Sequence, residues 1–123
     1  MIIWIITIIT VSSLPNIPTL KIHTAKVEFR LDYFMHFCEY GFLTFLTLLS
    51  FAYRDFKMKL SKVIMITSCL ILFSILDEYH QKLIPGRTCS IRDFISDGTG
   101  IISATIFMLF VFRSLNNVIG KTE

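Results

Sequence analysis

The sequence predicts an all-α protein, an integral membrane bundle of about four transmembrane helices that forms a single domain over residues 1–123. Hydrophobic residues make up 54% of the chain, and its 12 phenylalanines are more than a soluble domain of this size can bury. Charged residues account for only 17% and cluster between apolar runs. A chain embedded in a bilayer needs this alternation of long apolar runs and short charged loops.

Four apolar runs predict the helices, at about residues 1–14, 33–53, 61–79 and 91–112. The first run is short, because a bilayer core of about 30 Å needs roughly 20 helical residues. It has neither a positively charged start nor an A-x-A cleavage pattern, so it favours a membrane helix over a signal peptide. The second run is long enough to span a bilayer, and acidic residues border the third and the fourth.

The distribution of basic residues predicts a multi-pass protein of the cell membrane with both termini in the cytoplasm. Arg54, Lys57, Lys59 and Lys62 are concentrated between the second and third runs, and basic loops favour the cytoplasmic side. The net charge of +3 indicates contact with anionic lipid headgroups. We expect no nucleic-acid partner, since there is neither a glycine-rich phosphate loop nor a basic helix with interleaved aromatic residues.

Acidic residues reach into the third and fourth runs. The uncharged part of the third run is Val63 to Leu76, and fourteen residues extend only about 21 Å as a helix. The uncharged part of the fourth run, Gly98 to Phe112, extends only about 22 Å. Neither part crosses about 30 Å alone, so the carboxylates beside these runs should lie at or inside the membrane boundary and face one another.

Chain direction predicts that these polar residues meet in one leaflet, which the orientation above makes the outer one. The second run begins, the third ends and the fourth begins on the same side of the membrane. Helical spacing of three or four places polar side chains on one face of each helix. The predicted cleft has ten candidate ligand-binding residues: Asp32, His36, Glu39, Asp77, Glu78, Gln81, Arg87, Ser90, Asp93 and Asp97.

The loop before the fourth run carries two local signals. Pro85-Gly86 indicates a turn, and Ser90 followed by Asp93 fits a capping box that begins a helix near Ile91. The turn fixes the position of Arg87, which we expect to pair with a carboxylate of the cleft or to hold an anionic ligand through two hydrogen bonds.

The same residues resemble the VanZ-like family of small integral membrane proteins. Asp32, His36 and Phe37 match a D-x-x-x-H-F motif, while Tyr33 and Asp97 stand where the family usually has Lys and Asn. The family is named after an accessory protein of glycopeptide (teicoplanin) resistance, although most relatives lie outside resistance clusters. The resemblance covers roughly Ser12 to Phe112 and implies a cell-envelope protein. Its second motif is matched at Asp77, Glu78, Gln81, Pro85, Gly86, Arg87, Ser90, Asp93 and Gly100.

Three classes of function remain open. The first is binding or modulating a lipid, a cell-wall precursor or an amphiphilic antibiotic through the cleft, with the lipid bilayer as a further partner. The second is a membrane enzyme, a hydrolase or transferase, whose acids and His36 supply acid–base groups. No HExxH, nucleophile elbow or phosphatase-like triad is present, so no catalytic residue, metal site or cofactor is predicted. The third is a structural or scaffold subunit joined by buried hydrogen bonds, each worth about 0.6 kcal/mol.

Overall fold

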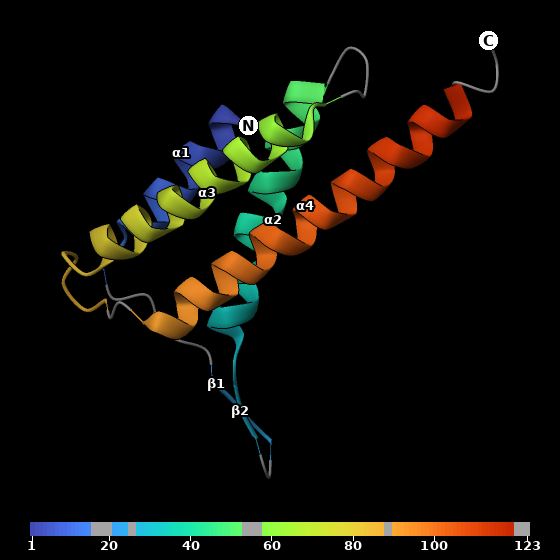
Figure 1. Cartoon of the computed structure of the whole chain (residues 1–123). Coiled ribbons are helices and arrows are strands. Elements are labelled where there is room, and N and C mark those ends of the chain that lie inside the picture. The colour runs from blue at the N-terminus through green and yellow to red at the C-terminus, as the bar shows by residue number, and fades with distance from the viewer. Residues whose placement is uncertain (16–20, 25–26, 53–57, 88–89, 120–123) are drawn as a thin grey trace.

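The computed structural model describes residues 1–15, 21–24, 27–52, 58–87 and 90–119. Within these ranges it confirms the helical membrane bundle, to which one short β-hairpin is added (Figure 1). The elements in chain order are α1 (Ile2–Ser12), β1 (Lys21–Thr24), β2 (Val27–Arg30), α2 (Leu31–Ala52), α3 (Leu60–Gln81) and α4 (Ile91–Ile119).

Three of these helices are long and apolar enough to cross a membrane. The helices α2 and α3 have 22 residues each, which corresponds to about 33 Å and therefore matches a hydrocarbon core of about 30 Å. The fourth helix is longer still. In contrast, α1 has 11 residues and extends only about 16 Å, roughly half of the core.

The distribution of side chains is the reverse of that in a water-soluble domain. Ile3 and Phe110 are 81% and 71% exposed, whereas the carboxylate residue Asp97 is 0% exposed. Large apolar side chains cover the outside of every helix, and the apolar core is a narrow strip that includes Ile8 and Leu43. This arrangement suits a bilayer, where apolar side chains face the lipid and ionisable groups face the interior of the bundle.

Helices α2 and α4 pack against each other more extensively than any other pair, and they cross in Figure 1. Glycines permit this approach. A Cβ atom added to Gly100 would collide with the backbone carbonyl of Phe37 and lie 3.1 Å from the backbone nitrogen of Gly41. Small residues at such a crossing let two membrane helices come into backbone contact. Near the middle of the bundle, the hydroxyls of Thr67 and Thr105 join α3 to α4 at 3.2 Å.

A tight turn leads from α3 toward α4, as the Pro85-Gly86 pair predicted. The amide of Arg87 donates to the carbonyl of Ile84 at 3.1 Å, and Gly86 has a φ of 81°. Proline at the second position and a positive φ at the third are characteristic of a type II turn, which requires glycine there. The turn directs the chain back to the same end of the bundle.

The elements differ from the expected bounds in two places. A hairpin occupies part of the segment that we expected to be a plain loop, with Lys21 opposite Arg30 in an antiparallel register. Each strand has only four residues, too few for a clear alternation of apolar and polar side chains. In addition, α4 continues past Phe112 to Ile119, because a helix can leave the membrane without ending. Tyr53, Arg54, Lys57 and Cys89 lie outside the described residues.

Candidate functional site

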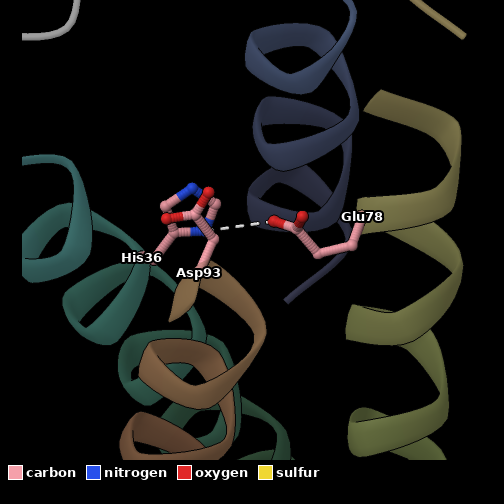
Figure 2. Close-up of side chains that lie close together, drawn as sticks. All are labelled: His36, Glu78 and Asp93. Carbon is pink, nitrogen blue, oxygen red and sulfur yellow. Dashed lines mark ion pairs between the residues drawn. The ribbon is translucent and has the colours of Figure 1, made fainter. Parts of the chain in front are cut away.

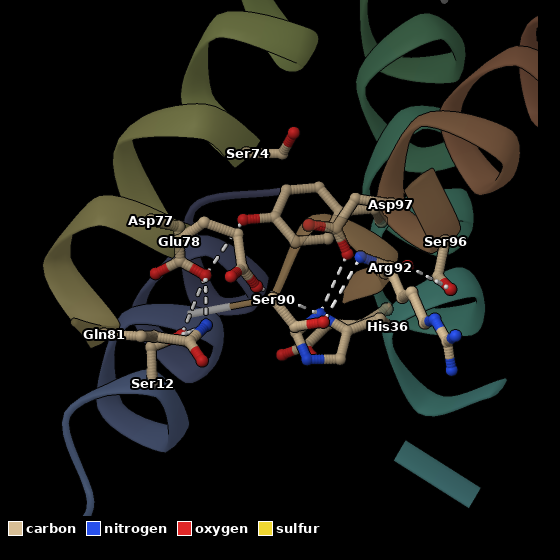
Figure 3. A network of polar contacts seen from close by, with 12 residues as sticks. Ser12, His36, Ser74, Asp77, Glu78, Gln81, Ser90, Arg92, Ser96 and Asp97 are labelled. Carbon is tan, nitrogen blue, oxygen red and sulfur yellow. Dashed lines mark hydrogen bonds and ion pairs between the residues drawn. The ribbon is translucent and has the colours of Figure 1, made fainter. Parts of the chain in front are cut away.

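Polar side chains are buried together at one end of the bundle. They come from the end of α1, the first half of α2, the end of α3 and the start of α4 (Figure 3). Each side chain is buried although most of the surrounding surface is apolar. We call them the polar cluster, and its members are Ser12, His36, Tyr40, Asp77, Glu78, Gln81, Asp93 and Asp97.

Helical geometry explains how the cluster assembles. Asp77 and Gln81 are four residues apart on α3, as are His36 and Tyr40 on α2 and Asp93 and Asp97 on α4. Residues at this spacing share one helix face. Asp97 lies six residues after Ile91, so the cluster extends about 9 Å along α4 from its first residue.

One half of the cluster is centred on Asp77. Its Oδ2 atom accepts hydrogen bonds from the hydroxyl of Ser12 at 2.9 Å, the hydroxyl of Tyr40 at 3.0 Å and the side-chain amide of Gln81 at 3.1 Å. The same amide also donates to Ser12 Oγ at 3.3 Å. These bonds connect α1, α2 and α3 through one carboxylate. The Asp77 half therefore has the arrangement expected of a structural junction between helices.

The other half is centred on His36, where donors are scarce. His36 Nδ1 lies 2.9 Å from Asp97 Oδ1 and 3.8 Å from Glu78 Oε1. Because a carboxylate can only accept, Nδ1 carries the hydrogen in the bond to Asp97. Neither oxygen of Glu78 has a hydrogen-bond partner, and Oδ2 of Asp97 also has none. Buried carboxylate oxygens without donors are unusual and point to a ligand or a chemical role.

Arg87 does not take the position that we expected for it. Its Nη2 atom donates to the carbonyl of Val11 at 2.7 Å, and its Nε atom donates to the carbonyl of Leu14 at 3.3 Å. The guanidinium therefore caps the last carbonyls of α1, where a cation also opposes the negative end of the helix dipole. Sequence reasoning did not anticipate these bonds, because it did not consider the carbonyls at the end of α1 as partners of Arg87.

The family comparison covers nearly the whole of this architecture. Residues 2–113 match the model of the VanZ/LLP1 family. The chain belongs to the VanZ/LLP1 family. No curated protein and no solved structure matches it. Membership makes the chain a membrane protein, and the two motifs quoted above lie on α2 and over the end of α3, the following turn and the start of α4.

In this VanZ/LLP1 protein, the residues of the two motifs contact each other across the α2–α4 crossing. His36 of the first motif bonds to Asp97, and the backbone of Phe37 lies against Gly100 of the second. Ser90 begins α4: its hydroxyl accepts a hydrogen bond from the amide of Arg92 at 3.2 Å. Asp93, three residues later, is buried in the polar cluster. The motifs therefore define one contiguous site.

Besides Arg87 and Ser90, the sequence candidates Glu39 and Asp32 also lie outside the polar cluster. Asp32 is half-buried in the first turn of α2, where a negative charge is favourable at the positive end of the helix dipole. Glu39 is half-buried and lines a groove of about 810 Å³ between α1, α2 and α4. We call this the apolar groove. Its lining includes Trp4, Val11, Phe37, Phe42, Ala104 and Phe107.

Three residues of the VanZ/LLP1 site were absent from the sequence candidates. Ser12 and Tyr40 complete the hydrogen bonding of Asp77, and Trp4 forms one wall of the apolar groove. Tyr40 had a usable signal, because it is four residues after His36 on the same face of α2. Ser12 and Trp4 depend on where α1 docks, and no residue spacing specifies that docking.

Proposed function

We propose that this VanZ/LLP1 membrane protein binds an envelope amphiphile that carries an amine, with its apolar chain in the apolar groove. A lipid, a cell-wall precursor and an amphiphilic antibiotic share the required chemistry, an apolar chain joined to a polar head. The observation that carries the proposal is the groove itself, which is about 810 Å³ and lined mainly by apolar side chains. Its volume is in the range of small-molecule binding sites.

Glu39 supports an amine as the polar head. It is the one charged residue among the residues described as lining the groove. A lone carboxylate in an apolar wall attracts a cationic group of a ligand more strongly than a carboxylate in water does. The neighbouring polar cluster adds four further acids and only one histidine, so the local charge also favours a cation over an anion.

Trp4 provides a direct reporter of the groove, because it is the only tryptophan of the chain. Its indole N–H donates to the backbone carbonyl of Glu39 at 3.0 Å, and its ring packs edge-on against Phe42 at 4.9 Å between centroids. These contacts hold the indole ring of Trp4 beside Glu39. Bromine atoms on a bound chain would therefore quench its fluorescence.

The test uses the full chain in lipid nanodiscs and two brominated probes of equal chain length, an alkylamine and an alkyl alcohol. We expect the amine to quench Trp4 at lower concentration than the alcohol. Glu39→Gln should weaken binding of the amine by roughly fivefold, equivalent to about 1 kcal/mol, and leave the alcohol unaffected. Asp32→Asn removes the same charge elsewhere on α2 and should keep the wild-type preference. A preference for the amine that survives in Glu39→Gln would contradict the proposal.

A membrane hydrolase or transferase is the second candidate function. It is favoured by the contact of His36 with Asp97 at 2.9 Å beside Glu78, a set of groups suited to acid–base chemistry. The same nanodisc preparation separates the two candidates. Conversion of a lipid-linked ester or phosphodiester, detected by mass spectrometry and lost in His36→Gln, would identify an enzyme. If the lipid-linked substrate is recovered unchanged, the result supports binding without catalysis.

A further inference from the structure

Three buried side chains from three different helices converge inside the polar cluster. His36 on α2, Glu78 on α3 and Asp93 on α4 each place one potential ligand atom within 4.8 Å of the others (Figure 2). In Figure 2 the carboxyl group of Glu78 points from α3 toward the other two side chains. The nitrogen and oxygen atoms of these groups are typical metal ligands.

The carboxylate of Glu78 gives a second, independent indication of a ligand at this position. Glu78 is only 4% exposed, yet neither of its carboxyl oxygens accepts a hydrogen bond. Its nearest described basic group, His36 Nδ1, is 3.8 Å away, beyond hydrogen-bond distance. Burying a carboxylate without donors is strongly unfavourable, so a cation at this position would remove a large penalty.

Among the residues that the structure describes, only His36 has a basic group within ion-pair distance of Glu78. Arg87 is the basic residue of the turn that precedes α4, and its guanidinium donates to the backbone carbonyls of Val11 and Leu14 at the end of α1. His36 contacts Asp97 as well as Glu78 and can carry at most one positive charge. Among the described residues, the carboxylates of Glu78 and Asp97 therefore share at most the single positive charge of His36.

We propose that His36, Glu78 and Asp93 bind one divalent transition-metal ion of the Zn²⁺ or Mn²⁺ type. One imidazole nitrogen with two carboxylates suits these ions better than Mg²⁺ or Ca²⁺, which prefer oxygen ligands alone. Asp97 accepts the hydrogen of His36 Nδ1, as carboxylates commonly do for histidines that bind metals, and this leaves Nε2 as the ligand atom of His36. Two ligands of one ion lie at most about 4.4 Å apart, so the side chains need to close by only a few tenths of an ångström.

This site goes beyond the proposed function and does not depend on it. It also differs from the sequence-based expectation of no metal site. Metal motifs are recognised by short spacings along one segment, whereas these three ligands are far apart in the sequence and meet only in the folded bundle. The helices thus assemble a donor set that a search for short motifs overlooks.

The experiment measures metal binding to the full chain, purified in detergent and stripped with a chelator. After equilibrium dialysis against Zn²⁺, Mn²⁺ or Mg²⁺ at equal concentration, elemental mass spectrometry should find one Zn²⁺ or Mn²⁺ per chain and no Mg²⁺. Glu78→Gln should abolish this binding, and Asp97→Asn should weaken it by about 10- to 100-fold. Asp32→Asn, a matched loss of charge on α2, should leave metal binding unchanged.

A thermal measurement separates loss of the site from loss of the fold. The metal should raise the Tm of the wild type and leave that of Glu78→Gln unchanged, while the two metal-free proteins unfold at similar temperatures. If Glu78→Gln does not fold, Co²⁺ added to the wild type decides instead, because four- or five-coordinate Co²⁺ absorbs visible light far more strongly than the hydrated ion. Wild-type protein without bound Zn²⁺ or Mn²⁺, a preference for Mg²⁺, or equal loss of metal in Asp32→Asn would overturn the proposal.

Discussion

At the scale of single residues, the polar cluster contains two kinds of carboxylate. Asp77 accepts three hydrogen bonds on one oxygen, whereas Glu78, the next residue of α3, accepts none. Burial is similar for both, so their hydrogen-bond partners account for the difference. A well-satisfied carboxylate stabilises the bundle, whereas an unsatisfied one is available to a ligand. Adjacent residues of one helix thus serve different purposes.

Replacing Tyr40 by Phe tests the structural role of Asp77. The change removes one donor from a buried carboxylate and should lower the free energy of unfolding by about 1–3 kcal/mol. Tyr79→Phe is the matched control, because Tyr79 is 63% exposed, and its effect should stay within about 0.5 kcal/mol. Thermal unfolding in detergent, followed by circular dichroism, measures both. Equal stability of the two variants would mean that the Asp77 bonds contribute nothing.

The sequence predicts part of this site, for identifiable reasons. Chain direction and helical spacing suffice to bring His36, Asp77 and Asp97 to one end of the bundle, and the structure places them together there. Arg87 could not be assigned, since its partners are backbone carbonyls of α1, and every helix end offers such groups. The difference between Asp77 and Glu78 also depends on α1, because Ser12 is a donor to Asp77 alone.

At the scale of elements, the crossing of α2 and α4 determines the site. It brings His36 to Asp97 and seats Gly100 against the backbone of α2. Gly100 is the glycine that makes this contact, and helical spacing alone does not distinguish it from Gly98 two residues earlier. The long apolar runs predicted the helices well. The hairpin was missed because pairing between β1 and β2 leaves little trace in four-residue strands.

Two glycines of α4 provide a matched test of this crossing. A Cβ atom at Gly100 would collide with the backbone of α2, whereas one at Gly98 would meet nothing within 4 Å. We expect Gly100→Ala to lower stability by about 1–3 kcal/mol, since the backbones must separate. Gly98→Ala should leave stability unchanged or raise it slightly, because alanine has the higher helix propensity. Thermal unfolding in detergent compares them, and equal stabilities would exclude close backbone contact at Gly100.

The Gly100→Ala variant should also affect the site. Separation of α2 from α4 increases the distance between His36 on α2 and Asp93 on α4, two of the three proposed ligands. Metal binding should therefore weaken in Gly100→Ala and persist in Gly98→Ala. The element and the site are thus tested by the same pair of variants.

At the scale of the whole molecule, six basic residues belong to each end of the chain's predicted topology, but they are most closely spaced between α2 and α3, at the end opposite the polar cluster. At the end opposite the polar cluster, Lys59 and Arg113 line a common hollow, and the ammonium group of Lys62 lies 5.0 Å above the ring of Phe51. These basic residues are available to anionic headgroups. At the polar end, Arg87 is bound to the backbone of α1. The positive-inside rule therefore favours the polar cluster in the outer leaflet.

Labelling of single cysteines tests this orientation. In a background with Cys38, Cys69 and Cys89 replaced by Ala, we introduce Leu83→Cys beside the polar cluster and Lys59→Cys at the opposite end. Both positions are exposed, so a reagent can reach either one from its own side of the membrane. A maleimide that cannot cross membranes should label Leu83→Cys in intact cells and Lys59→Cys only after permeabilisation, because basic residues are retained in the cytoplasm. The opposite pattern would place the polar cluster in the inner leaflet, and its ligand would then arrive from the cytoplasm.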